Sequence, residues 1–446
     1  MLAPLAVAVV LGLLYRPATL ACVVVALTVL CEGPTFGFVH FTSNLYVQIY
    51  KGLTPLDVLV ALVVLSVGID AIRRRRPIRI SRALLPGVTI LLLAMLAGAI
   101  TGHAAGMSWR TVVLLENVLC YLLVLPVAIS NLELDRRQVA ALLGAITALA
   151  LSKAVLGLIE VAGHYGQSIE GSSTLTYYEP AANWLIMIAL FGVFAALVAR
   201  AKPPLWMLLG SPLLIASIVL SYRRSFWIAT VLGLLLVLLL GTSPLGRRML
   251  LPAALAIALA IFLLGSIKFQ AQIPVVKRVE SLTPTQLTSN VEDRYRLDER
   301  ANVLAELRHH PITGLGLGIA WQATAQPLSV EHEEGRQYVH FAALWFWLKL
   351  GILGLVAYVM MLAGGALLAW RVWRRSHEPM LRAFGLASLC AIAGLVVIET
   401  TASFTGIDPR FTVLLGAQIG LLALLDRTAP RRLYGFAESS DSTAVV

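Results

Sequence analysis

The chain has 446 residues, of which 59% are hydrophobic and only 13% are charged. Soluble globular proteins are about 45–50% apolar and about 25% charged, so this composition excludes an ordinary water-soluble domain. The formal charge of +11 does not indicate a nucleic-acid partner, because the basic residues cluster between apolar runs, as is typical of membrane topology. The cysteines all lie inside apolar runs and predict neither a disulfide framework nor a zinc site. They are Cys22, Cys31, Cys120 and Cys390.

Apolar segments long enough to cross a bilayer run along most of the chain. A span needs about 20 apolar residues to cross about 30 Å of hydrocarbon. The first stretch, 2–31, is interrupted by Tyr15, Arg16 and Pro17, and we interpret it as one broken span because each half is only about 21 Å long. The other candidate spans are 54–72, 84–101, 111–130, 138–161, 182–199, 205–221, 226–241, 249–266, 341–370, 383–401 and 411–425. We therefore predict an all-α polytopic membrane protein with about 12 transmembrane helices.

Basic clusters orient these spans. With the first cluster placed in the cytoplasm and the spans alternating, every other cluster also falls on the cytoplasmic side, as the positive-inside rule requires. Both termini are then expected in the cytoplasm. The clusters are Arg73–Arg76 with Arg79 and Arg82, Arg136–Arg137, Arg200 with Lys202, Arg247–Arg248, Arg371 with Arg374–Arg375, and Arg431–Arg432.

This topology divides the chain into four parts. Residues 1–266 hold about nine of the predicted transmembrane helices, and 267–340 form a large loop on the far side of the membrane. Three more spans occupy 341–425, and 426–446 form a cytoplasmic tail. The large loop is too long for a simple connector, and long loops are usually functional. We expect helix in it around 291–310, followed by a Gly-rich turn.

Two arginines break the charge rule. Arg223 and Arg224 lie in a very short turn on the far side, between two strongly apolar spans. One interpretation is that they are anchors that extend to the interface beside Tyr222 and Trp227. Because adjacent arginines on the translocated side are disfavoured for insertion, we favour a site for a bound anion.

The large loop contains a second arginine pair and a histidine. Arg296 and Arg300 are four residues apart and would share one face of a helix, where forked hydrogen bonds could grip a diphosphate. Taken alone, a solvated helix with local ion pairs is the commoner arrangement. His340 stands where the loop re-enters an apolar span. A lone histidine there is more often structural, yet it is also a base suited to neutral pH at the level of a lipid headgroup. His309 and His310 match no zinc spacing.

Ionisable residues inside the predicted spans keep a second class of function open. Such residues usually face the bundle interior or a water-filled cavity, where they can form an ion or proton path. A transporter is therefore possible, although the sequence shows neither an inverted repeat nor a pair of broken helices. These residues are Glu116, Lys153, Glu160, Lys349 and Glu399.

Three elements occur in an order that resembles a known family. The first is the Ser-x-x-Arg turn at 221–224, and the second is Arg296 followed by Pro-x-x-Gly-x-Gly-x-Gly at 311–318. The third is His340 opening a span that continues to Gly-x-x-Gly at 351–354. From about residue 170 to 425 this pattern resembles the bacterial O-antigen ligase and polymerase superfamily. The chain departs from it at three positions: Arg300 stands where the family often has Trp, Phe341 where it has Asn, and Lys349 where it has an acid.

The resemblance implies a membrane-embedded glycosyltransferase of the C type in the bacterial inner membrane, with its active site facing the periplasm. An O-antigen ligase would move a glycan from undecaprenyl diphosphate to the lipid A-core oligosaccharide, inverting the anomeric centre, with no metal or other cofactor. The resemblance implies that His340 is the general base and that Arg223, Arg224, Arg296 and Arg300 bind the diphosphate. An O-antigen or exopolysaccharide polymerase is the alternative within the superfamily, and a transporter or flippase is the alternative outside it.

Overall fold

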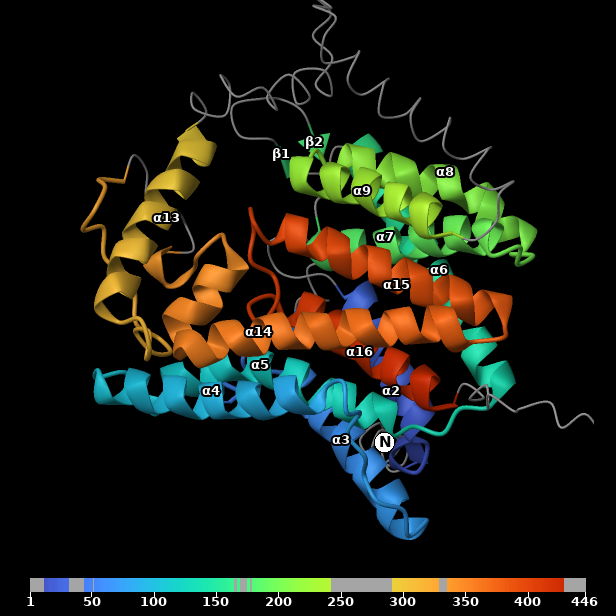
Figure 1. The fold of residues 1–446 in the computed structure, drawn as a ribbon, viewed down its shortest axis with the longest axis horizontal. Coiled ribbons are helices and arrows are strands. Elements are labelled where there is room, and N and C mark those ends of the chain that lie inside the picture. The colour runs from blue at the N-terminus through green and yellow to red at the C-terminus, as the bar shows by residue number, and fades with distance from the viewer. Residues whose placement is uncertain are drawn as a thin grey trace, which may run out of the picture.

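The computed structural model describes residues 12–31, 44–50, 52–163, 167–168, 175–176, 179–241, 291–328 and 335–428. Over these ranges the chain is a bundle of α helices with one antiparallel pair of two-residue strands, β1 (Gln167–Ser168) and β2 (Leu175–Thr176) (Figure 1). The predicted span 249–266, residues 267–290 of the large loop and residues 429–446 of the tail lie outside the described residues, as do the basic pairs at 247–248 and 431–432.

Each predicted span whose residues are described has a helix at its place. Before the large loop these helices are α2 (Pro17–Leu30), α3 (Pro55–Arg73), α4 (Leu85–Ala104), α5 (Trp109–Ser130), α6 (Arg136–Ala162), α7 (Pro180–Val198), α8 (Leu205–Leu220) and α9 (Arg224–Leu240). The loop contributes α13 (Val291–His309) and a 3-10 turn, Gly335–Gln337, and the chain continues with α14 (Ala342–Arg375), α15 (Pro379–Ile398) and α16 (Pro409–Thr428). Seven helices of the described part are long and apolar enough to cross a membrane, so a multi-pass membrane protein is confirmed, whereas the count of about 12 spans stays a prediction.

Local sequence sets where several helices begin. At the start of α3, the Thr54 hydroxyl accepts a hydrogen bond from the Asp57 N–H (3.2 Å) and the Asp57 carboxylate accepts one from the Thr54 N–H (2.6 Å). This reciprocal pair is a capping box, and Pro55 occupies the first helical position, where its missing N–H costs nothing. Asp135 and Gln138 form the same box at the start of α6. These helices therefore begin at defined residues rather than fraying.

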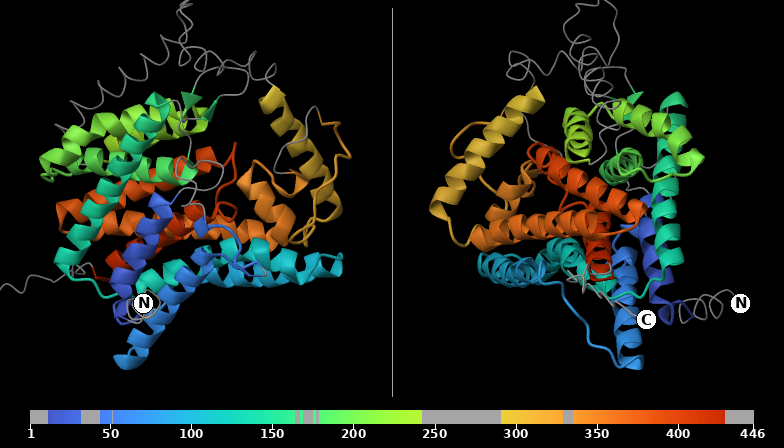
Figure 2. Two further views of the ribbon diagram at one scale, coloured as in Figure 1. Left: turned by 180° about the vertical axis from the view of Figure 1, so that it is seen from behind. Right: turned by 45° about the vertical axis from the view of Figure 1, so that its right-hand side comes forward.

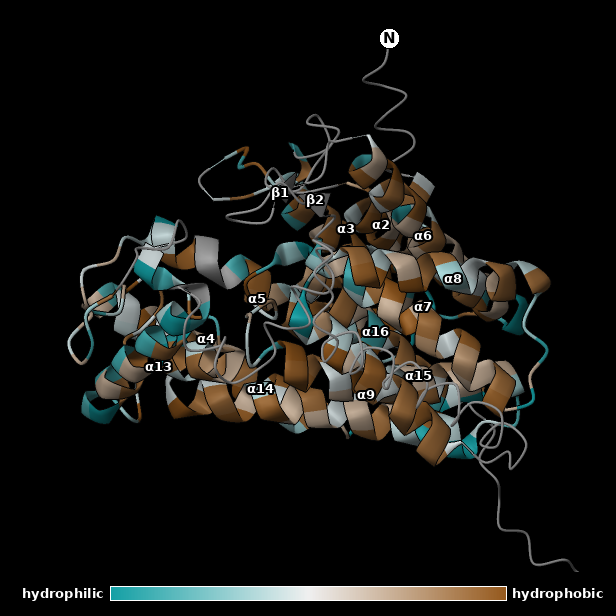
Figure 3. Cartoon of the chain, turned by 90° about the horizontal axis from the view of Figure 1, so that it is seen from above, coloured by the Kyte–Doolittle hydropathy of each residue, from teal (hydrophilic) through white to brown (hydrophobic). Residues whose placement is uncertain are grey.

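The helices differ in how much of their surface the protein itself covers. In α7 and α16, 83% of the apolar window is buried, against 33% in α6 and 39% in α3. The outer helices expose large apolar side chains, such as Ile72 (79% exposed) and Leu209 (69%), which is the pattern of lipid-facing surface. Figure 3 shows the bundle helices largely hydrophobic and α13 largely hydrophilic. α13 packs on α14 at the flank of the bundle (Figure 2).

The predicted span 341–370 coincides with most of α14, and the structure adds a break in this helix at Gly351 (φ 69°, ψ −168°). The Ile352 N–H bonds to the carbonyl of Ile312 in the large loop (3.0 Å) instead of to its own helix. A Cβ on Gly351 would lie 2.1 Å from that same carbonyl oxygen, so only glycine fits there. The first turns of α14 are thereby separated from the long membrane helix that follows (Figure 1).

Ion pairs connect several helix ends on one side of the bundle. They join the residues after α3 to the α5–α6 connection, the start of α6 to the residue before α15, and the end of α14 to the end of α16. These are the ends that the charge pattern assigns to the cytoplasm, so the described basic clusters there lie together. The pairs are Arg76–Glu133 (2.6 Å), Arg136–Glu378 (2.5 Å) and Arg371–Asp426 (3.7 Å). Which side of the membrane this end faces remains a prediction from charge.

Candidate functional site

The segment that carries His340 is held in place from two directions. The Trp321 indole N–H donates to the Tyr338 carbonyl (3.0 Å), and Trp321 itself is fully buried. On the other side the Ser403 hydroxyl donates to the Val339 carbonyl (2.6 Å), and the Ser403 N–H donates to the Tyr338 hydroxyl (3.0 Å). The large loop and the connection after α15 therefore fix the backbone on which His340 stands.

Glu299 of α13 binds His340 through two groups. Its carboxylate accepts a hydrogen bond from the His340 backbone N–H (2.8 Å) and lies 3.1 Å from the ring Nδ1 atom. An ionised carboxylate can only accept, so Nδ1 carries a proton and Nε2 is the nitrogen that can take one from a substrate. Glu299 is 2% exposed and His340 7%. The pair thus fixes both the orientation and the tautomer of the imidazole.

Two tyrosine rings contact the imidazole. Tyr338 meets His340 edge to face, with ring centroids 4.8 Å apart, and Tyr295 does so at 5.9 Å. Tyr295 and Glu299 are four residues apart on α13, so both project from the face of the helix that meets His340. The aromatic edges restrict the ring further.

The start of α9 and the first turns of α13 meet around Asp293. The Arg224 Nη2 atom donates to both carboxylate oxygens of Asp293 at 2.6 Å, and the Arg296 Nη1 atom lies 3.7 Å from Asp293 Oδ1. Arg223 is the residue that caps α9 and is partly buried. One carboxylate therefore lies between two guanidiniums.

The turn that presents these arginines is buried and strained. Tyr222 adopts φ 50°, which is uncommon for a residue with a side chain. Tyr222 and Trp227 are 7% and 8% exposed, and the Trp227 indole donates to the Ile218 carbonyl (2.9 Å). Burial raises the pKa of the Tyr222 phenol above its ordinary value. These aromatics contact protein rather than lipid, which weighs against the interpretation of the turn as a set of interfacial anchors.

α13 links the arginine group to the histidine. Arg296 faces Asp293, while Arg300, one turn further on, lies with its guanidinium carbon 5.8 Å from the ring centre of Phe341, the neighbour of His340. One turn of helix rises about 5.4 Å. Arg296 and Arg300 therefore lie on the same helix as Glu299, the partner of His340, and Arg224 contacts that helix at Asp293.

Sequence interpretation missed the role of Glu299. A usable signal was present: α13 is polar overall, but its residues at spacings of three and four are buried. An acid on that face needs a partner, because a buried charge without one is costly. The buried residues are Tyr295, Glu299, Asn302, Val303 and Leu307.

The Gly-rich turn approaches neighbouring helices. A Cβ on Gly316 (φ +94°) would lie 2.4 Å from the Gly102 nitrogen of α4, and the Leu317 N–H donates to the Gly98 carbonyl (3.0 Å). The Lys349 ammonium donates to the carbonyl of Ile319. The turn is thus a packing device that closes the large loop onto α4 and α14, and Lys349 holds it there.

Two more of the ionisable residues in the predicted spans, Lys153 and Glu399, have polar partners. Glu179, at the start of α7, binds the Lys153 ammonium of α6 (2.9 Å) and the Arg410 guanidinium of α16 (2.5 Å), and all of these side chains are at most 4% exposed. The Glu399 carboxylate accepts from the Tyr358 hydroxyl (2.5 Å) and from the Thr405 N–H (2.7 Å). These contacts join helices. The Glu116 side chain lies outside the described side chains.

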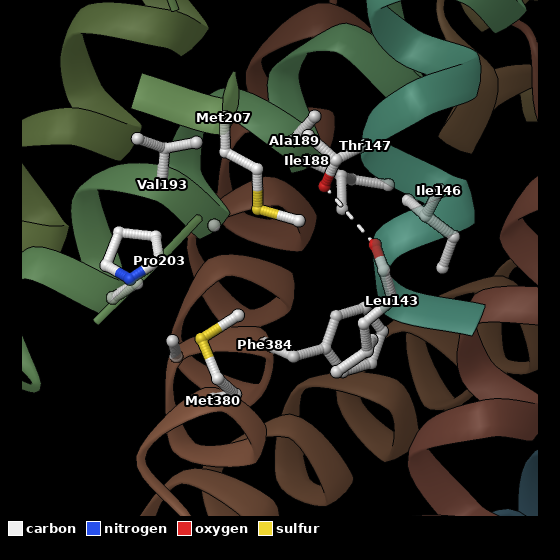
Figure 4. Close-up of a pocket in the computed structure, with 13 residues that line it drawn as sticks. Leu143, Ile146, Thr147, Ile188, Ala189, Val193, Pro203, Met207, Met380 and Phe384 are labelled. Carbon is white, nitrogen blue, oxygen red and sulfur yellow. Dashed lines mark hydrogen bonds between the residues drawn. The ribbon is translucent and has the colours of Figure 1, made fainter. Parts of the chain in front are cut away.

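An apolar pocket lies elsewhere, between α6, α7, α8 and α15 (Figure 4). Its lining includes Thr147, Met207, Met380 and Phe384. Met380 stands at the start of α15, whereas the residues that support His340 follow its end, and a 20-residue helix is about 30 Å long. No candidate site residue lines this pocket. Among the residues described, no group of three or more His, Cys, Asp or Glu side chains is placed to hold a metal.

Comparison with known proteins identifies one segment. Residues 209–359 match a protein-family model described as O-antigen ligase. The matched segment runs from α8 into α14 and contains Arg223, Arg224, Arg296, Glu299 and His340. It confirms the family resemblance over about a third of the chain, a shorter range than the 170–425 expected. No curated protein matches the chain.

Proposed function

Since residues 209–359 match a family model described as O-antigen ligase, we propose that the chain is an O-antigen ligase of the bacterial inner membrane. It transfers a polysaccharide from undecaprenyl diphosphate to the lipid A-core oligosaccharide on the periplasmic side. The observation that carries this proposal is the Glu299–His340 pair, with Nδ1 3.1 Å from the carboxylate. Glu299 lies on the same helix, α13, as Arg296 and as Asp293, which binds Arg224.

His340 acts as the general base. Its Nε2 atom takes the proton of an acceptor hydroxyl while the oxygen attacks the anomeric carbon of the donor sugar. The bond from that carbon to the diphosphate oxygen breaks, and its electron pair leaves with the lipid diphosphate, so the anomeric centre inverts. The imidazolium that forms is stabilised by the buried Glu299 carboxylate beside it. The donor bond is already activated, so the proposal needs no nucleotide or metal.

The arginines bind the leaving group. Arg224 and Arg296 are held side by side by their shared contacts to Asp293, so a diphosphate would find two guanidiniums already placed. Guanidiniums bind phosphate oxygens with forked, charge-assisted hydrogen bonds, and they stabilise negative charge as it develops on the leaving diphosphate. Arg223 precedes Arg224 in the turn before α9, and Arg300 follows Arg296 by one turn of α13. The proposed role for all four is to hold the donor and to lower the barrier for its departure.

Reconstitution tests the proposal. The purified chain in proteoliposomes, given a lipid-diphosphate-linked polysaccharide and lipid A-core, should produce capped lipopolysaccharide, and a deletion strain should lose capped lipopolysaccharide while lipid-linked polymer accumulates. Single repeat units retained on lipopolysaccharide in the deletion strain would instead identify a polymerase. If the deletion strain shows neither glycan phenotype and the purified chain is inactive in proteoliposomes, both the ligase and the polymerase function are refuted.

A further inference from the structure

A polar cavity of about 180 Å³ lies outside the site described above. Its walls come from the connection before α3 and from α3, α5 and α16. The lining is unusual for a membrane bundle, because six of its nine residues carry a hydroxyl, amide or carboxylate group. The residues are Tyr46, Gln48, Gly52, Thr54, Asp57, Asn117, Val118, Tyr121 and Pro409.

The volume suits a six-membered ring. A cavity of roughly 150 Å³ lined by apolar residues holds benzene, so about 180 Å³ accommodates a ring of that size with polar substituents. A purely structural polar group in a membrane bundle is normally packed closely against its partners. The open space in front of these side chains therefore indicates a site for a ligand.

The carboxylate in the wall is rigidly placed. Asp57 accepts hydrogen bonds from the Tyr121 hydroxyl (2.5 Å), the Thr54 hydroxyl (2.8 Å) and the Asn117 amide (3.3 Å). On the opposite wall, the Tyr46 hydroxyl donates to the Cys31 carbonyl (2.7 Å). Burial raises the pKa of the Tyr46 phenol, so it stays a donor. The cavity is therefore formed before any ligand arrives.

The chemistry of the wall favours a neutral polyol. Amide and hydroxyl groups offer both donors and acceptors, which matches sugar hydroxyls, because each of these is both a donor and an acceptor. An aromatic ring in the lining, such as that of Tyr121, suits the apolar face of a sugar ring. Asp57 is the charged residue among the described residues that line the cavity. Two guanidiniums contact the wall from outside the lining: Arg110 donates to Gln48 (3.4 Å), and Arg410 lies 5.6 Å from the centre of the Tyr46 ring.

One short connection of the chain contacts both the cavity and the segment that carries His340. The connection after α15 contacts the histidine segment at Ser403 and lines the cavity at Pro409. Six residues of extended chain cover at most about 20 Å. An oligosaccharide seated in the cavity can therefore present another of its sugars near His340.

We propose that this cavity is a subsite for a sugar ring of the acceptor oligosaccharide. The proposal rests on the proposed transferase function. An acceptor anchored in the membrane carries its first sugars at the level of the helix ends, where this cavity opens between α3, α5 and α16. A donor glycan, by contrast, extends from its diphosphate into water. The cavity fixes which end of the acceptor lies beside the base.

A cavity-filling variant tests the subsite. Val118→Phe places a ring in the cavity without removing a polar group, and Val113→Phe on the exposed face of the same helix (36% exposed) is its matched control. In proteoliposomes with lipid-linked polysaccharide and lipid A-core, Val118→Phe should raise the acceptor KM about tenfold, whereas the donor KM and kcat stay near wild type. Gln48→Ala, in an exposed connection that cannot unfold the bundle, should raise the acceptor KM about threefold.

Direct binding separates this inference from the proposed function. Delipidated core oligosaccharide, titrated calorimetrically onto the protein in nanodiscs, should bind wild type and Val113→Phe equally and Val118→Phe at least tenfold more weakly. Equal binding by Val118→Phe, or no binding by wild type, overturns the subsite, and a rise in the donor KM alone assigns the cavity to the donor instead. If Val118→Phe weakens binding but the wild-type protein transfers no glycan, the ligase function is refuted. The sugar site is then still supported.

Discussion

Glu299 and His340 are 41 residues apart in the chain and are joined by two hydrogen bonds, one to the His340 backbone N–H and one to its Nδ1 atom. A surface histidine turns freely and exchanges tautomers, whereas this one is held by a carboxylate that is 2% exposed. The pair leaves Nε2 for the proton transfer proposed above, so that α13 has a direct part in placing the proposed base.

Glu299→Gln tests this positioning role. The amide keeps the shape of the side chain but loses the charge that stabilises an imidazolium, so kcat should fall about 100-fold while both KM values change little. Glu299→Asp should recover part of the loss because it restores the carboxylate. Asp298→Asn, one position earlier and half-buried, is the matched control and should transfer glycan at the wild-type rate. Wild-type kcat in Glu299→Gln would show that the carboxylate has no part in the reaction.

His340→Ala and His340→Asn distinguish loss of the proposed general base from loss of folded protein. Asparagine can still donate a hydrogen bond to Glu299, so His340→Asn should accumulate in membranes as wild type does. Both variants should lose glycan transfer by about 10³-fold, because neither side chain can accept the acceptor proton. The measurement is transfer per amount of membrane protein. Retained activity in either variant removes the general-base role.

Arg224→Lys tests the donor contact. A lysine keeps the positive charge but cannot make a forked contact, so the donor KM should rise about tenfold while the acceptor KM is unchanged. Arg294→Lys is the control, since Arg294 is exposed on α13. If Arg224→Lys and Arg296→Lys both have the donor KM of wild type, this result would argue against a diphosphate bound beside Asp293.

Gly314→Ala tests the packing role of the Gly-rich turn. Gly314 and Gly335 share φ +65°, but a Cβ on Gly314 would lie 2.5 Å from the Leu348 carbonyl oxygen, whereas nothing lies within 4 Å of one on Gly335. Both variants incur backbone strain of about 1 kcal/mol, and only Gly314→Ala adds a clash. Its melting temperature in detergent should fall further than that of Gly335→Ala. Equal melting temperatures would mean that the close approach does not stabilise the fold.

Cysteine labelling tests the sidedness of the bundle. In a background without the four native cysteines, Ile312→Cys should react with an impermeant reagent added from outside, and Arg374→Cys should not. Ile312 is 73% exposed on the large loop, which makes it a better probe than Arg224, whose side chain is 10% exposed. Reaction at position 374 in intact cells would invert the proposed orientation.

The sequence by itself determined the positions of the described spans, the helix near 291–310 and the arginines that break the charge rule. These features are local: the length of an apolar run is set by the thickness of the bilayer, and a capping box or a basic cluster is read within a few residues. The family resemblance also came from the order of short motifs, and the match at residues 209–359 confirms it.

Only the tertiary structure shows which side chains the ionisable residues bind. Asp293 meets Arg224 across 69 residues, Glu179 meets Arg410 across 231, and Glu299 meets His340 across 41. Such contacts depend on how helices pack, and a sequence that marks a residue as ionisable does not say which distant charge will neutralise it. The break of α14 at Gly351 follows the same logic, because the carbonyl that requires a glycine there belongs to the returning loop. The lengths of the apolar runs set where the helices lie, and packing holds the histidine at the end of the large loop against a buried carboxylate.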